Sequence, residues 1–284
     1  MRAYVEYLRD LGVHDFYRHG RPVEAERLIP LSGPSSVATL KPVSAPEPAS
    51  VFASTVPAVT AVREPSSLEP VMPRPISFNE LAPLPQATMA VAARPAALAT
   101  LRDEIGDCTR CPLAYAGRRS IVFGNGDPAA RLMFVGEGPG ADEDATGEPF
   151  IGKAGQLLNN MINAMGLQRE QVYVANIVKC RPPANRVPEP IEATTCSQFL
   201  LRQIDIVQPQ VIVALGTTAA MYLLGVKQSL ASLRGLWHAC RGAKLAVTYH
   251  PAFLLRDPRQ KGEAWKDLQR VMAELGLDVP KRPA

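Results

Sequence analysis

The sequence predicts an α/β fold: a three-layer α/β/α sandwich around a roughly four-stranded parallel sheet, with a disordered N-terminal extension. Short apolar runs alternate with segments of helical periodicity, which is the pattern of a parallel sheet with crossover helices. The runs are almost continuously apolar, as strands covered on both faces require. The C-terminal part of this 284-residue chain is also long enough to bury one large core.

The predicted elements follow one another along this C-terminal part. Strands are expected at residues 131–136, 172–178, 211–216 and 244–249. Helices are expected at residues 153–166, 217–225 and 263–276, where apolar residues recur at helical spacing. Ligands of open parallel sheets bind beyond the carboxyl ends of the strands. The residues just past the four predicted strands are therefore expected to share one pocket: Glu137, Asn176, Gly216, Thr217 and His250.

The chain divides into four parts by composition. Residues 23–97 hold 13 of the 27 prolines and are rich in Ala and Ser, so we expect a disordered linker there. Residues 1–22 have the apolar spacing of a short amphipathic helix, which either recruits a protein partner or has no role. The folded domain is expected over residues 98–279, followed by a tail at 280–284.

Composition also limits the compartment and the partners. The N-terminus lacks the apolar core of a secretory signal, and no apolar run approaches the roughly 18 residues that cross a membrane. We therefore expect a cytoplasmic protein with no membrane partner, whose cysteines bind metal or remain free thiols. The net charge of +4 is only weakly indicative of nucleic-acid binding.

The Gly-rich segment VGEGPGADEDATGEPFIGKAGQLL, residues 135–158, follows a predicted strand and precedes a predicted helix, the usual place of a phosphate-binding loop. Its GEPFIGKA portion is close to the P-loop pattern, but Ala154 replaces the hydroxyl that binds Mg²⁺ and Pro149 removes a backbone N–H. Its carboxylates would also repel a triphosphate. The sequence therefore disfavours nucleotide binding, and with it a zinc-binding P-loop enzyme.

Four cysteines have a spacing typical of a metal site. Cys108 and Cys111 form a C-x-x-C pair, and Cys180 and Cys196 follow the second predicted strand. Four thiolates can hold Zn²⁺ or a [4Fe–4S] cluster. The split second pair favours the cluster only slightly, and four unrelated buried cysteines remain an alternative. Cys240 is interpreted as a structural thiol.

Taken together, these motifs resemble the family 4 uracil-DNA glycosylases, the iron–sulfur branch of the uracil-DNA glycosylase superfamily. The matching stretches, spread over about residues 101–275, are CTRCPL, VGEGPGADEDATGEPFIGKAGQLL, VYVANIVKCRPPANR and YHPAFLLR. Gly138 is a small departure, because the family more often has Ala there. The resemblance implies the fold argued above, base excision repair of uracil-containing DNA, and a [4Fe–4S] cluster on Cys108, Cys111, Cys180 and Cys196.

The resemblance also implies roles for individual residues. Phe150 would stack on a uracil flipped out of the duplex. Asn176 would pair with the uracil edge, since its amide offers both a donor and an acceptor. His250 would donate a hydrogen bond to uracil O2 as negative charge gathers on the departing base.

Two acids complete the site by the same resemblance. Backbone groups of Glu137 and Gly138 would close the pocket around the base. Glu143 is the acid best placed to stabilise a cationic sugar and orient water, or else to shape the pocket. Glu137 matches a family position too, and the water-activating group stays unassigned between these two acids.

The segment after His250 is expected to hold the DNA. Leu254 or Leu255 would fill the gap left by the flipped nucleotide, while Arg256 and Lys261 would neutralise phosphates. Lys179 and Arg181 would do the same from the facing loop.

Two rival functions remain to be weighed. A non-catalytic iron–sulfur DNA-binding module would have no use for Phe150, Asn176 and His250 together. A relative that bonds covalently to the abasic site would carry a nucleophilic histidine, which KCRPPANRVPEP lacks. The sequence thus favours a hydrolase that releases an abasic product, and one pocket per chain leads us to expect a monomer.

Overall fold

The computed structural model describes residues 76–85 and 87–278. The predicted N-terminal helix at residues 1–22, the tail at 280–284 and most of the predicted linker lie outside the described residues. No helix in the described part of the chain is long and apolar enough to cross a membrane.

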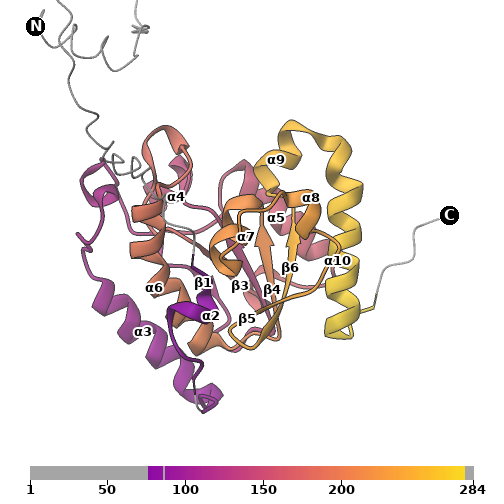
Figure 1. The fold of residues 1–284 in the computed structure, drawn as a ribbon, viewed down its shortest axis with the longest axis horizontal. Helices are drawn as coiled ribbons and strands as arrows, with labels where there is room; N and C mark the ends of the chain where they lie inside the picture. Colours follow the sequence, from indigo (N-terminus) through magenta and orange to yellow (C-terminus); the bar gives the residue numbers. More distant parts are fainter. Residues whose placement is uncertain (1–75, 86, 279–284) are drawn as a thin grey trace, which may run out of the picture. The chain divides into compact units, whose positions relative to one another are not determined.

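The centre of the domain is a mixed sheet with strand order β1-β3-β2-β4-β6-β5 (Figure 1). The four inner strands are parallel and confirm the predicted ones: β2 (Leu132–Gly136), β3 (Tyr173–Asn176), β4 (Val211–Leu215) and β6 (Ala243–Thr248). The edge strands β1 (Asn125–Gly126) and β5 (His238–Cys240) pair antiparallel with their neighbours. They are too short to leave an apolar pattern, so the sequence did not predict them.

Helices cover both faces of the sheet. The longer ones are α3 (Arg94–Ile105), α5 (Lys153–Ala164), α6 (Pro190–Val207), α7 (Thr217–Leu224) and α10 (Lys261–Leu275). The shorter ones are α2 (Phe78–Leu81), α4 (Ala141–Thr146), α8 (Leu230–Leu233) and α9 (Pro251–Arg256). Single 3₁₀ turns are η1 (Val91–Ala93), η2 (Pro112–Tyr115), η3 (Arg169–Gln171), η4 (Pro183–Asn185) and η5 (Pro258–Gln260).

The alternation of side chains along the strands creates two cores. Met133 and Val135 of β2 pack in a cluster with α3, α6 and α7, whereas Leu132 and Phe134 pack with α5 and α10. Figure 1 shows α3 and α6 on one side of the sheet and α10 on the other. The predicted three-layer α/β/α architecture is therefore confirmed.

Helix α6 was not predicted, because polar residues interrupt its apolar face. Glu192, Ser197 and Gln203 are buried on it. The amide of Gln203 donates to the Phe123 carbonyl (2.9 Å) and to the Tyr173 hydroxyl (3.1 Å). These hydrogen bonds satisfy the buried amide of Gln203. Because polar residues stand at buried positions of α6, its sequence lacks the helical spacing of apolar residues.

The folded domain begins before the predicted boundary at residue 98. Phe78 is fully buried and belongs to the core around α6 and α7. Arg94 donates to the Val207 carbonyl (2.7 Å), and Arg241 donates to the Phe78 and Pro83 carbonyls. The end of the predicted linker is therefore part of the domain.

Candidate active site

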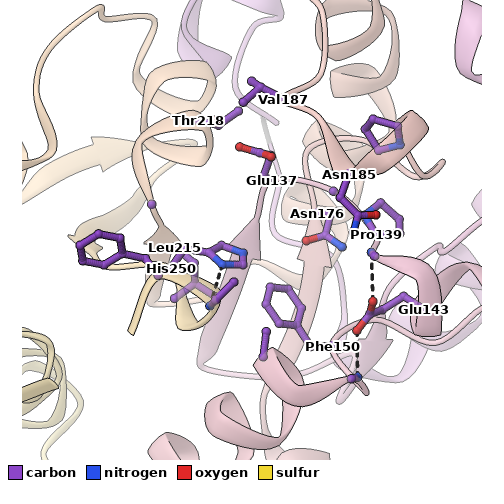
Figure 2. Close-up of a pocket in the computed structure, with 18 of the residues that line it drawn as sticks. Glu137, Pro139, Glu143, Phe150, Asn176, Asn185, Val187, Leu215, Thr218 and His250 are labelled. Carbon is purple, nitrogen blue, oxygen red and sulfur yellow. Dashed lines mark hydrogen bonds between the residues drawn. The ribbon is translucent and has the colours of Figure 1, made fainter. Parts of the chain in front are cut away.

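The carboxyl ends of the parallel strands open into one cavity of about 720 Å³. Glu137 follows β2, Asn176 ends β3, Gly216 follows β4 and His250 follows β6, and all four line this cavity (Figure 2). Phe150, Gly138 and Glu143 line it as well. The structure thus brings together residues that are far apart in the sequence.

Asn176 presents an unpaired polar atom to this cavity. Its side chain is buried, and its Oδ1 has no hydrogen-bond partner among the described residues. Gly136 makes this arrangement possible, since a Cβ there would lie 2.4 Å from Asn176 Oδ1 and 2.5 Å from Phe150 Cζ. Leaving a buried acceptor unpaired costs about 1–3 kcal/mol. A ligand that donates a hydrogen bond would remove that cost.

Phe150 is held in an unusual backbone conformation. Its φ is 56°, in the left-handed region that non-glycine residues seldom adopt. The absence of a Cβ at Gly155 lets α5 start directly against the Phe150 carbonyl. The Phe150 ring lies 5.7 Å from the His250 ring between centroids, at an interplanar angle of 34°. An aromatic face and an imidazole therefore meet in the cavity (Figure 2).

Glu143 uses both carboxylate oxygens to fix the loop that carries Phe150. Its Oε2 accepts from the Gly140 N–H, and its Oε1 accepts from the N–H groups of Ile151 and Gly152, each at 3.0 Å. The side chain is buried and links α4 to the turn after Phe150. Of the two roles expected for Glu143, this geometry supports shaping the pocket.

A Glu143→Gln substitution should therefore slow the uracil excision that the sequence resemblance implies, because it disturbs this loop. The glutamine amide would turn an N–H₂ group toward at least one backbone N–H, so a bond worth roughly 1–3 kcal/mol is lost. We expect a rate at least tenfold lower and a lower melting temperature, with DNA affinity little changed. Single-turnover kinetics and thermal unfolding would measure both, and unchanged values would contradict this role.

The hydrogen bonds of His250 fix its tautomer. His250 is the N-cap of α9, and its Nδ1 accepts from the Ala252 N–H (3.1 Å). The proton of the neutral ring is therefore on Nε2. Burial lowers the pKa of His250 to about 4, helped by the positive charge of Arg256 and opposed by Glu143. At neutral pH, the ring is an uncharged donor.

This lowered pKa makes stability depend on pH in a defined direction. Between about pH 6.5 and 4 the unfolded chain binds a proton at His250 that the folded chain does not, so acidification through this window favours unfolding. The full difference corresponds to about 3 kcal/mol. We expect the free energy of unfolding of a His250→Gln variant to fall less over this window. Denaturant titrations at pH 6.5 and pH 4 would contradict this if the two proteins changed equally.

Glu137 and Gly138 form the start of the loop on the other side of the cavity. Figure 2 shows the Glu137 side chain among the residues that line the cavity. It makes no hydrogen bond or ion pair with the described residues, unlike Glu143. A Cβ at Gly138 would lie 2.7 Å from Val178 Cγ2. The glycine therefore allows this loop to pack closely on the residues after β3.

The expected DNA-binding residues divide by exposure. Of the two leucines expected as alternatives for filling the gap in DNA, Leu254 is 1% exposed and lies in the interior, so burial excludes it, whereas Leu255 is 43% exposed. Arg256 is exposed and lines the cavity, and Lys261 is exposed at the start of α10. Lys179 is a second correction: it is buried, and its Nζ donates to the Asn176 carbonyl (2.9 Å), so it cannot bind phosphate.

Several residues at the cavity were missed in the sequence. Val187 is 59% exposed at its edge, and Asn185 and Arg186 lie beside it on the loop before α6. Tyr249 and Phe253 flank His250 and also line the cavity. Two features of the sequence could have pointed to these residues. One is the Pro-rich composition of the loop, and the other is the closeness of Tyr249 and Phe253 to His250 along the chain.

The four cysteines expected to bind metal line a second, smaller cavity. All are free thiols. Arg118 donates to Cys180 Sγ (3.3 Å), and the Lys179 N–H donates to Cys196 Sγ (3.2 Å). Burial raises the pKa of the Cys196 thiol to about 12. Two thiols thus already accept hydrogen bonds, as thiolate ligands of a cluster do.

Among the described residues, no three His, Cys, Asp or Glu side chains lie close enough to hold one metal ion. The four thiols around this cavity are a donor set that Zn²⁺ and a [4Fe–4S] cluster both use. Cys240 lies apart, fully buried in β5.

Comparison with known proteins agrees with this geometry. The model of the uracil DNA glycosylase superfamily matches residues 123–269, which include the parallel sheet and the cavity. The type-4 uracil-DNA glycosylase of Thermotoga maritima is 45% identical over 176 residues, covering 61% of this chain and 87% of the relative. That of Pyrobaculum aerophilum is 42% identical over 189 residues, covering 64% and 95%. The chain belongs to the type-4 uracil-DNA glycosylase family.

A more distant relative is the type-5 uracil-DNA glycosylase of Thermus thermophilus, which is 30% identical over 179 residues, covering 50% of this chain and 81% of the relative.

Proposed function

We propose that the protein excises uracil from DNA by hydrolysing its N-glycosidic bond, leaving an abasic site for base excision repair. The observation that carries this proposal is the unpartnered Oδ1 of buried Asn176, which shares a cavity with Phe150 and neutral His250. These three groups offer an edge partner, a stacking face and a hydrogen-bond donor. The substrate is uracil-containing DNA, and the cavity needs no second subunit.

Selectivity follows from the two polar atoms of the Asn176 amide. Its Oδ1 accepts from uracil N3–H, while its amide nitrogen donates to uracil O4. Cytosine has an acceptor at N3 and a donor at its exocyclic amine. In the buried site, acceptor would therefore face acceptor and donor would face donor. Each such mismatch costs roughly 1–3 kcal/mol. Phe150 stacks on the base and keeps it in register with this amide.

His250 supplies the catalytic hydrogen bond. Its Nε2–H donates to uracil O2, and that bond strengthens as the glycosidic bond breaks and negative charge develops on the base. The Ala252 N–H holds the ring through Nδ1, so the donor is oriented before the base arrives. His250 keeps its Nε2 proton during this step, because it acts as a hydrogen-bond donor and not as a general acid.

The carboxylates have separate tasks in this proposal. Glu143 is occupied by three backbone N–H groups and holds the Phe150 loop. Glu137 makes no such bonds and lines the same cavity, so it is the acid that stabilises positive charge on the sugar and orients the attacking water. Two basic side chains, Arg256 and Lys261, bind phosphates of the DNA backbone. The exposed side chain of Leu255 fills the gap left by the flipped nucleotide.

In this proposal, Cys108, Cys111, Cys180 and Cys196 would hold a [4Fe–4S] cluster in the second cavity. The donor set supports this assignment, because four thiols line one cavity and two accept N–H hydrogen bonds. Held by Cys180 after β3 and by Cys196 within α6, a cluster would fix the residues between them, which include Asn185 and Val187 of the active-site cavity. Its role is therefore structural.

A Cys180→Ala variant tests the cluster, with Cys240→Ala as its control. Both thiols are buried, but only Cys180 lines the second cavity. We expect Cys180→Ala to lose most of its iron and visible absorption, and Cys240→Ala to keep both. Iron and sulfide assays on the purified proteins measure this. Equal iron content in the two variants would contradict the assignment.

Incubation with a uracil-containing oligonucleotide tests the proposed function. Wild-type protein should release free uracil and leave an alkali-labile strand without remaining attached to it. A protein–DNA adduct on a denaturing gel would instead favour covalent capture of the abasic site. DNA binding without uracil release would favour a non-catalytic iron–sulfur module.

A further inference from the structure

Tyr249 and Phe253 form an aromatic pair that uracil binding does not use. Their rings are stacked, with centroids 5.2 Å apart and an interplanar angle of 16°. Both are half-buried and line the active-site cavity. The uracil of the proposed function already has Phe150 as its stacking partner, and a cavity of about 720 Å³ is far larger than one base. The pair therefore belongs to a part of the cavity beyond the uracil.

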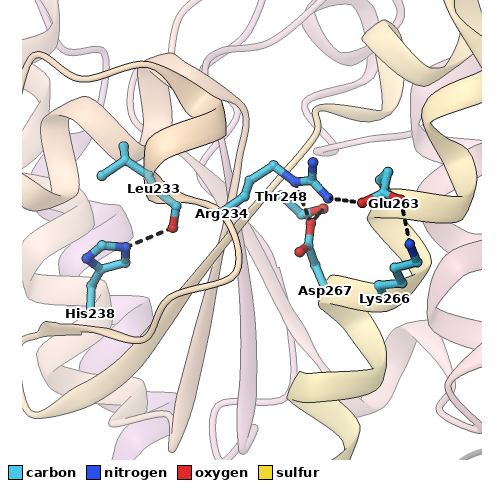
Figure 3. Close-up of polar contacts among 7 residues, drawn as sticks. All are labelled: Leu233, Arg234, His238, Thr248, Glu263, Lys266 and Asp267. Carbon is cyan, nitrogen blue, oxygen red and sulfur yellow. Dashed lines mark hydrogen bonds and ion pairs between the residues drawn. The ribbon is translucent and has the colours of Figure 1, made fainter.

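A buried ion pair, drawn in Figure 3 without the aromatic rings, contacts the Tyr249 ring of this pair. The Arg234 guanidinium lies 4.2 Å from the Tyr249 ring centroid. Its Nε donates to Asp267 Oδ2 (2.7 Å), and the same oxygen accepts from the Thr248 hydroxyl (2.8 Å). The side chains of Arg234 and Asp267 are 12% and 7% exposed. Arg234, Tyr249 and Phe253 therefore form a fixed stack anchored on α10.

We propose that this stack binds the nucleobase adjacent to the flipped uracil. The proposal rests on the proposed function. Adjacent nucleotides share one phosphodiester, so a neighbour of the flipped uracil must lie at the edge of the same cavity. Every nucleobase offers a π-face, so a base of any identity can stack on protein aromatics. Arg256, exposed in the same cavity, supplies positive charge for the linking phosphate.

The rigidity of the stack explains why such a weak contact matters. A ring already fixed by Arg234 and Asp267 loses little conformational freedom when a base stacks on it, so more of the stacking energy appears as affinity. Tyr249 and Phe253 also flank His250, so a base bound there would hold the strand beside the catalytic donor. The stack thus contributes to binding of the strand, whereas Asn176 and Phe150 recognise the base that leaves.

The test pairs a protein change with a DNA change. Single-stranded oligonucleotides carry uracil with either a normal base or an abasic spacer on its 5′ or 3′ side. The enzyme concentration for half-maximal single-turnover excision is measured for wild type and Phe253→Ala. We expect the spacer on one side to raise this concentration about tenfold for wild type. Phe253→Ala should need this higher enzyme concentration even when the normal base is present, and the spacer should not raise the concentration further.

Matched variants keep the result interpretable. Phe253→Leu retains an apolar side chain without a ring, and it should fold normally yet lose sensitivity to the spacer. Tyr115→Ala removes an aromatic that is 78% exposed and lines neither cavity, so it should behave as wild type. The proposal would be overturned if the losses caused by Phe253→Ala and by the spacer multiplied, as independent effects do. It would also be overturned if Phe253→Leu were as sensitive to the spacer as wild type. Failure of the proposed function would look different: wild type would release no uracil even from the normal oligonucleotide.

Discussion

A His250→Ala variant is expected to excise uracil about 10²–10³-fold more slowly than wild type at pH 7. In the proposed mechanism, the Nε2–H donor acts where charge develops in the transition state, and loss of one such preorganised donor typically has this effect. The uncharged ring contributes little to ground-state binding of DNA, so affinity should change much less than rate. Single-turnover excision with saturating enzyme, combined with a DNA-binding titration, separates the two quantities.

His238 provides the control for this experiment. It is a half-buried histidine in β5 whose Nε2 lies 3.0 Å from the Leu233 carbonyl oxygen (Figure 3), and it does not line the active-site cavity. His238→Ala should therefore excise uracil at nearly the wild-type rate. If both variants were equally slow, the loss would reflect general destabilisation, and the catalytic role of His250 would be refuted.

The second large effect is expected at Asn176. Asn176→Ala would remove both proposed hydrogen bonds to the base edge, each worth roughly 1–3 kcal/mol in a buried site. We expect kcat/KM for uracil excision to fall by about 10²-fold or more, with most of the selectivity against cytosine lost. Steady-state kinetics on otherwise identical uracil and cytosine oligonucleotides would measure both changes.

Asn159 is the matched control for Asn176. Its Oδ1 is also buried without a partner among the described residues, but Asn159 lies on α5 and does not line the cavity. Asn159→Ala should keep wild-type kinetics and relieve an unsatisfied acceptor. A similar loss in both variants would show that a buried amide of this kind matters for folding rather than for recognition of the base.

The sequence predicted the inner sheet well because burial on both faces leaves continuous apolar runs. Those runs placed Asn176 and His250 at strand ends, and the rule for parallel sheets then predicted one shared edge. The short strands β1 and β5 and the polar-faced helix α6 left no such runs. The packing of residues 76–97 was hidden by their Pro and Ala content, which indicates a linker unless a partner surface is known.

Side-chain direction was the other limit of the sequence. Leu254 and Leu255 are adjacent and chemically equal, and only the path of α9 decides that the first is buried and the second exposed. Lys179 looked like a phosphate ligand because a lysine is rarely buried. In the fold it donates instead to the Asn176 carbonyl and to Gln203 Oε1 (2.6 Å). Such contacts depend on helix α6, which the sequence did not predict.

Base selectivity tests the central claim most directly. Wild-type protein would be given oligonucleotides that differ only in carrying uracil, cytosine or thymine at one position, and the free base would be quantified under single-turnover conditions. A buried amide paired to the uracil edge and a neutral histidine at O2 predict rapid uracil release. They also predict cytosine release at least about 10⁴-fold slower, because unpaired polar groups in a hydrogen-bonding site discriminate this strongly. Release of cytosine at a rate comparable to that of uracil would contradict the account.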